Sequence, residues 1–136
     1  MLAGRDVPRL VVGELNEIAF GSFDDGPLDE YRAWAASNPP AQPAPGGGES
    51  RAAVALRFAR GLRLILGRPE RVVLLVGHAL ALRYVIDAAS GLVPAPLIAP
   101  VDHATPFVLS AAEVDSAAAI LEDWSRSPRF RDHSIG

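Results

Sequence analysis

One long apolar run dominates the sequence, and it is interrupted at a single dipeptide, Gly77-His78. Residues 71–77 (RVVLLVG) show no alternation of polar and apolar positions, which is typical of a strand covered on both faces of a parallel sheet. Residues 80–90 then have a helical pattern, and Gly91 follows where that helix would end. A buried strand followed at once by a helix predicts an α/β fold.

Three further helices are expected elsewhere in the chain. Pro27 stands where proline opens a helix, which predicts a short helix over Leu28–Ala36. A capping box that begins at Ser110 starts a helix expected over 111–125. Residues 49–66 also have a helical pattern, since their apolar side chains recur on one face: Val54, Phe58, Leu62 and Ile65.

Two further short strands are expected, one around Leu10–Val12 and one over Thr105–Leu109, where Pro106 weakens the prediction. The Pro/Gly-rich stretch 37–48 is expected to be a surface loop. Since strands and helices alternate in the second half of the chain, we expect a layered α/β/α fold with a mainly parallel sheet.

Composition limits the domain organisation and the classes of partner. A chain of 136 residues suits one domain, which we expect over 1–125 with a polar tail over 126–136. A net charge of −3 gives no reason to expect nucleic acid. The absence of cysteine excludes disulfides and thiol nucleophiles, and no metal or other cofactor is expected. Neither a membrane span nor a signal peptide is recognisable, so a cytoplasmic protein is expected.

His78 stands at the junction of the expected strand and helix. Ligands of open parallel sheets bind just outside the carboxyl ends of strands, where the next helix directs its N-terminal N–H groups. A phosphate at this place would meet an imidazole and backbone donors together. The alternative is a histidine that only caps the turn, and the pattern alone leaves both interpretations open.

Four segments of the chain match known motifs in a fixed order. They are residues 14–34 (ELNEIAFGSFDDGPLDEYRAW), 46–58 (GGGESRAAVALRF), 72–92 (VVLLVGHALALRYVIDAASGL) and 102–110 (DHATPFVLS). Together they resemble the histidine phosphatase superfamily, the phosphoglycerate mutase-like proteins. The third segment resembles the second histidine motif of that family, in which an apolar strand, Ser-His-Gly and a helix with an arginine follow one another.

This resemblance implies roles for two residues. His78 resembles the histidine that contacts the transferred phosphoryl group, and Glu17 resembles the carboxyl general acid that protonates the leaving oxygen. Phosphoryl transfer needs donors around the phosphoryl oxygens and a proton for the leaving group. Taken alone, Glu17 would be a solvated loop carboxylate, and Glu14 is its nearest competitor.

Other residues of these motifs have less specific interpretations. Ala79 replaces the motif glycine and is expected beside the bound phosphate. His103 replaces the usual asparagine and lies either at the pocket rim or on the surface. Arg83 either lines the pocket or forms a structural ion pair. Glu49 and Ser50 are expected to cap the start of a helix rather than to do chemistry.

The nucleophile motif of the family, Arg-His-Gly, does not occur in these 136 residues. We therefore expect a phosphomonoester hydrolase of the phosphohistidine type that is truncated or has a misassigned start, and that is inactive as this chain. The alternative is a non-catalytic protein on the same fold that binds phosphate or an interaction partner. The expected ligand is phosphate or a small phosphorylated metabolite, and a homodimer would cover the exposed sheet edge. An unrelated role for a generic α/β domain is the third alternative.

Overall fold

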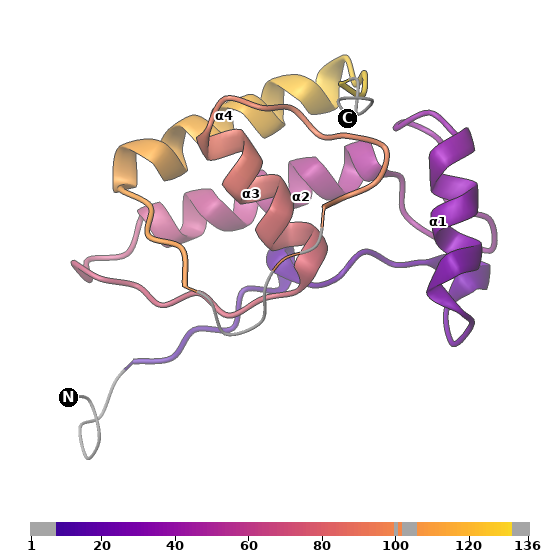
Figure 1. Ribbon diagram of the computed structural model, residues 1–136. Coiled ribbons are helices and arrows are strands. Elements are labelled where there is room, and N and C mark those ends of the chain that lie inside the picture. Colours follow the sequence, from indigo (N-terminus) through magenta and orange to yellow (C-terminus); the bar gives the residue numbers. More distant parts are fainter. Residues whose placement is uncertain (1–7, 100, 102–105, 132–136) are drawn as a thin grey trace.

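The structure is a computed structural model that describes residues 8–99, 101 and 106–131, and helices are its regular elements in these ranges (Figure 1). The elements are, in chain order, the 3-10 helices η1 (Gly13–Leu15) and η2 (Gly21–Phe23) and the helices α1 (Leu28–Ser37), α2 (Arg51–Leu66), α3 (Ala79–Ala89) and α4 (Ala111–Arg126). The four helices expected from the sequence are therefore confirmed.

Helices α2, α3 and α4 pack together, and α1 stands apart at one end of the molecule (Figure 1). The apolar face of α2 lies against α4, where Phe58 and Leu121 are fully buried. Tyr84 of α3 joins this core, with its ring 6.0 Å from that of Phe58 and 6.5 Å from that of Trp124. Each such buried side chain stabilises the bundle by about 1.5–3 kcal/mol.

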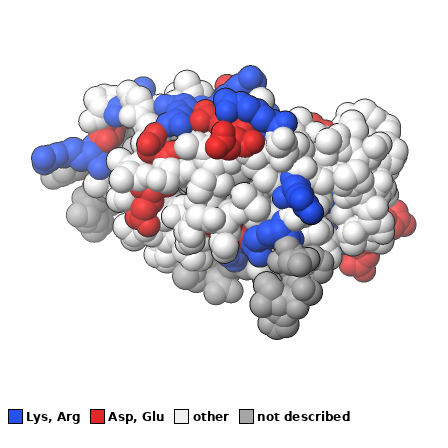
Figure 2. Space-filling model, turned by 90° about the horizontal axis from the view of Figure 1, so that it is seen from above, with Lys and Arg blue, Asp and Glu red and all other residues white. Residues whose placement is uncertain are grey.

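Ion pairs on the surface also join α2 to α4. Arg63 of α2 donates to the carboxylate of Glu122 at 2.9 Å and also pairs with Asp115. Figure 2 shows acidic and basic side chains gathered side by side on this face, next to a broad uncharged area. Because these pairs are largely solvent-exposed, their contribution to stability is small compared with that of the apolar core.

A second, smaller core fixes α1 to the N-terminal part of the chain. Tyr31 is buried and meets the ring of Phe20 edge-on at a centroid distance of 4.7 Å. The loop over 37–48 closes on η2, since the amide of Ser22 donates to the carbonyl of Pro45 at 2.8 Å. Gly21 at this contact has a φ of +62°, and a Cβ there would lie 2.2 Å from the same carbonyl oxygen. This close approach therefore requires glycine.

The expected layered α/β/α fold is wrong for the part of the chain that the structure describes, which contains neither a strand nor a sheet. The segments predicted as strands, 10–12, 71–77 and the described residues 106–109, are irregular chain without a ladder. Val72 and Leu74 expose 88 % and 85 % of their surface, whereas Leu75 packs against the core. An extended segment becomes a strand only when another segment pairs with its N–H and C=O groups. The described residues offer no such partner.

The end of the described chain contacts the bundle. Phe130 packs against Trp124 with ring centroids 5.8 Å apart, and the Arg131 guanidinium donates to the carbonyl of Val93 at 2.8 Å. The predicted boundary between a domain over 1–125 and a polar tail stays a prediction. Of the described helices, none combines the length and apolarity needed to cross a membrane.

Candidate active site

One arginine holds the loop that carries Glu17. Arg57 lies on α2, and its guanidinium donates to the carbonyls of Glu14 and Asn16 at 3.0 and 2.9 Å. The same group donates to the carbonyl of Glu17 at 3.3 Å. A planar guanidinium with several fixed donors can bind several carbonyls of one loop in this way. The backbone of Glu17 is thereby attached to a helix of the bundle.

Glu49 attaches the next part of the same loop. Its carboxylate accepts from the amide of Ala19 at 2.8 Å and forms an ion pair with Arg57, also at 2.8 Å. Burial opposes ionisation of this carboxyl, but hydrogen bonds from Arg57 and Ala19 and the charge of Arg57 outweigh it and lower the pKa of Glu49. Ser50 caps α2 as predicted, because its hydroxyl accepts from the amide of Ala53 at 3.0 Å. Glu49 was also expected to act at this helix start, and it joins the start of α2 to the loop that carries Glu17.

Glu17 is half-buried, and its Oε1 accepts from the amide of Ile18 at 3.0 Å. The residue lines a cavity of about 120 Å³ that lies between α1, the start of α2 and the start of α3. Ala79 and Leu80, the first two residues of α3, line the same cavity. The structure therefore brings Glu17 and the N-terminal end of α3 to one place.

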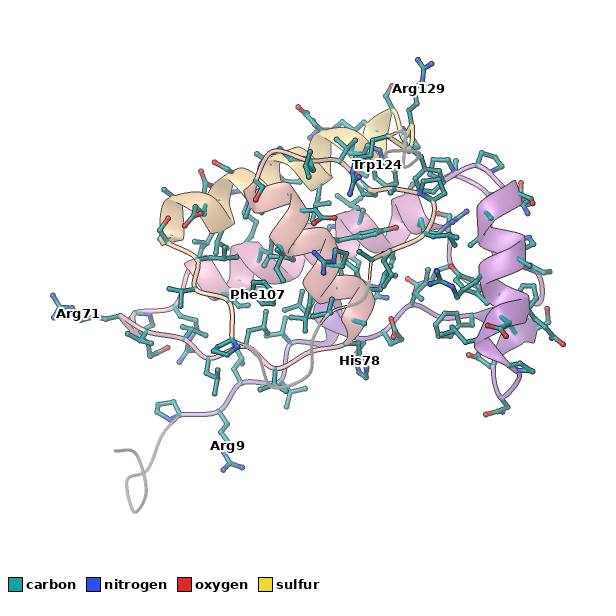
Figure 3. All side chains as sticks on the ribbon, viewed as in Figure 1. Arg9, Arg71, His78, Phe107, Trp124 and Arg129 are labelled. Carbon is teal, nitrogen blue, oxygen red and sulfur yellow. The ribbon has the colours of Figure 1, made fainter. Side chains whose placement is uncertain are left out.

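His78 directly precedes α3 and has an exposed side chain that makes no capping hydrogen bond. Figure 3 shows it at the N-terminal end of α3, directed away from the bundle. Its carbonyl accepts from the amide of Leu82 at 3.0 Å, so only its backbone takes part in the helix. The structure does not support the alternative in which the side chain caps the turn.

Two other candidates from the sequence lie away from this arrangement or outside the described residues. Arg83 pairs with Asp87 at 3.3 Å, and the second carboxylate oxygen of Asp87 accepts from Arg131 at 3.0 Å. This bridge is a structural ion pair, the simpler of the two interpretations of Arg83. His103 lies outside the residues that the structure describes, so its placement at a pocket rim stays a prediction.

Sequence reasoning missed two buried polar residues of the cavity wall, Tyr31 and Arg51. Arg51 is only 2 % exposed, although arginine is rarely buried unless it is paired. A signal for its burial was present, because Arg51 lies three and seven residues before Val54 and Phe58, on the same helical face. No comparable signal exists for Tyr31.

Comparisons with known proteins bear on the whole arrangement. The family model of the histidine phosphatase superfamily (branch 1) matches residues 1–125. A comparison with curated proteins and one with solved structures found no match. The matched range contains Glu17 and His78. Within the described residues, no cluster of three or more His, Asp or Glu side chains is suited to hold a metal ion.

Proposed function

Because the chain belongs to the histidine phosphatase superfamily, we propose that it carries the phosphoryl-binding and acid-donating part of a phosphomonoester hydrolase site. The observation that supports this proposal most is the shared cavity, which Glu17 lines together with the first residues of α3. His78 directly precedes those residues, and its side chain is exposed and engaged in no cap. The expected ligand is phosphate or a small phosphorylated metabolite.

In the proposed site the phosphoryl oxygens bind at the N-terminal end of α3. The imidazole of His78 and the free N–H groups of the first turn donate to these oxygens, since a helix N-terminus favours negative charge. Where a nucleophilic histidine forms the new bond to phosphorus, Glu17 donates a proton to the leaving oxygen as the old bond from phosphorus to that oxygen breaks, and the product leaves as a neutral alcohol. Arg57 and Glu49 fix the loop from which Glu17 acts.

A phosphohistidine mechanism also needs a nucleophilic histidine. The Arg-His-Gly motif that supplies it in the family does not occur in these 136 residues. We therefore expect phosphate binding without turnover by this chain, because His78 and Glu17 bind the phosphoryl group and donate a proton but do not attack phosphorus.

Hydrolysis of 4-nitrophenyl phosphate and binding of inorganic phosphate test the proposal together. The expected result is no turnover above the buffer rate, with phosphate binding that His78→Ala weakens. Turnover by this chain that is lost in His78→Ala would show that it holds its own nucleophile. If the chain binds no phosphate and hydrolyses no ester, the proposed site is wrong.

The absence of Arg-His-Gly from the printed sequence also favours a second candidate function. This is a non-catalytic phosphate-binding or interaction protein on the same scaffold. The genomic sequence upstream of Met1 discriminates between the two. A continuous reading frame that encodes Arg-His-Gly favours the hydrolase, whereas phosphate binding without such a frame favours the non-catalytic protein.

A further inference from the structure

The cavity beside Glu17 contains a second set of polar groups that the proposed phosphoryl site does not use. Its walls are mainly apolar, formed by side chains that include Leu28, Leu80, Leu97 and Ile98. Tyr31 and Arg51 also line it, and each keeps one buried polar atom without a hydrogen-bond partner, the Tyr31 hydroxyl and Arg51 Nε. Buried polar atoms are nearly always paired in native proteins, so two unpaired donors on one cavity need a physical explanation.

Arg51 is a buried cation whose contacts are all with uncharged groups. Its terminal nitrogens donate to the carbonyls of Ala35 at 3.0 Å and Asn38 at 2.9 Å. The guanidinium carbon also lies 5.2 Å from the ring centroid of Trp34 and 4.8 Å from that of Phe130. Among the described residues no carboxylate pairs with this cation. Arg51 therefore links α2 to the C-terminal end of α1 through these carbonyls. Its positive charge has no counter-ion among the described residues.

Tyr31 lies on α1 and is the second residue of the lining with an unpaired polar atom, its hydroxyl. The ring is held edge-on by Phe20 and Phe23, at centroid distances of 4.7 and 5.8 Å. Burial is the main cause that raises the pKa of Tyr31, so this hydroxyl keeps its proton near neutral pH and is a donor. Both unpaired atoms are closed to solvent in this structure, so a ligand reaches them only when α1, which packs chiefly on η2, moves away from Arg51.

We propose that this cavity is a second anion subsite, which binds the carboxylate of a small organic acid with a short aliphatic tail. One carboxylate oxygen accepts from Arg51 Nε and the other from the Tyr31 hydroxyl, while the tail lies among the apolar walls. The charged residues of the lining are Arg32, Arg51 and Glu17, which leave one positive charge in excess for a monoanion. At these two donors a phosphate dianion fits less well, because its remaining oxygens would face apolar walls, so the phosphoryl group stays at the N-terminal end of α3.

Titration with propionate, followed through the indole N–H signals of the two tryptophans, tests this subsite. Trp34 contacts Arg51, whereas Trp124 donates its indole N–H to the carbonyl of Arg129 at 2.8 Å. The expected result is a saturable shift of the Trp34 signal that is larger than that of Trp124. Tyr31→Phe is expected to weaken propionate binding about tenfold, because it removes one hydrogen bond to a charged acceptor.

Tyr31→Phe separates a binding role from a structural one. Since the Tyr31 hydroxyl has no partner in the free protein, its removal is expected to leave the thermal midpoint unchanged or higher. Tyr84→Phe, at the other buried tyrosine of the same cavity, is the matched control and is expected to bind propionate as the unmodified protein does. A lower midpoint for Tyr31→Phe with unchanged propionate affinity would overturn the proposal.

Two further results would overturn the proposal without touching the proposed phosphoryl site. One is a propionate titration that leaves the Trp34 signal in place. The other is a loss of propionate binding in His78→Ala or on addition of equimolar inorganic phosphate, since either would mean that both anions share one site. Continued propionate binding in His78→Ala, together with weakened phosphate binding, is the result that supports two separate subsites.

Discussion

The ion pair between Arg57 and Glu49, at 2.8 Å, fastens the start of α2 to the loop that carries Glu17. Arg57 also donates to backbone carbonyls of this loop, and Glu49 accepts from the amide of Ala19. A single pair of side chains thus connects the Gly-Glu-Ser segment, whose sequence gives no hint of this role, with the candidate general acid.

Replacement of Arg57 is expected to loosen this connection. Arg57→Met should lower the free energy of unfolding by about 2 kcal/mol, because it leaves the Glu49 carboxylate without its charged partner. Arg60→Met, an exposed arginine on the same helix, is the control and should change the stability little. Denaturant unfolding of both variants provides the measurement. Equal effects of the two replacements would contradict the proposed role of Arg57.

The same pair predicts a dependence of stability on pH. Because the pKa of Glu49 is lower in the folded protein than its ordinary value of 4.5, the ionised carboxylate stabilises the fold at neutral pH. This contribution is fully present above pH 4.5 and is lost as the pH falls through the lowered value. Glu49→Gln should therefore reduce the thermal midpoint at pH 7 and differ progressively less from the unmodified protein in acid. Glu30→Gln, at an exposed glutamate of α1, is the control for the change of charge and should lower the thermal midpoint at pH 7 less than Glu49→Gln.

The capping box of α4 is present as the sequence predicts. The Ser110 hydroxyl accepts from the amide of Glu113 at 3.1 Å, and the Glu113 carboxylate accepts from the amide of Ser110 at 2.9 Å. Ser110→Ala should therefore cost about 1 kcal/mol in the free energy of unfolding. Ser116→Ala, in the exposed interior of the same helix, should be neutral or slightly stabilising. A Ser110→Ala variant as stable as Ser116→Ala would contradict the importance of the cap.

These results indicate which parts of the fold the sequence encodes locally. Helix starts depend on neighbouring residues, such as Pro27 before α1 and Ser110 before α4, and these were predictable. A strand depends on a partner that is distant in the sequence, so the apolar pattern of 71–77 could not show that only one side of the segment is covered. The position of Arg51 on the apolar face of α2 signalled its burial, but its carbonyl partners could not be predicted, since they come from two other segments of the chain.

The uncovered side of segment 71–77, with Leu74 and Val76, forms part of a mainly apolar groove of about 750 Å³ that Val85 and Phe107 also line. Exposed apolar surface of this extent favours association, so we propose this groove as the contact of the homodimer that the sequence led us to expect. Leu74→Glu should lower the fraction of dimer in sedimentation velocity and the binding of an apolar dye. Leu64→Glu changes a half-exposed leucine of α2 outside the groove and serves as the control. A monomer at all concentrations, or equal effects of the two variants, would contradict this prediction.

The proposed phosphoryl site is tested most directly by a titration with inorganic phosphate, followed through the backbone amide signals. The expected result is a saturable shift of the amides of Ala79 and Leu80 at the start of α3, with affinity reduced about tenfold in His78→Ala. The fold should be unchanged in this variant, because the His78 side chain is exposed and caps nothing. His133→Ala, at a histidine of the predicted polar tail, is the control, and His103→Ala tests the other candidate histidine. Amide shifts that occur elsewhere, or that persist at full affinity in His78→Ala, would contradict the assignment of this site.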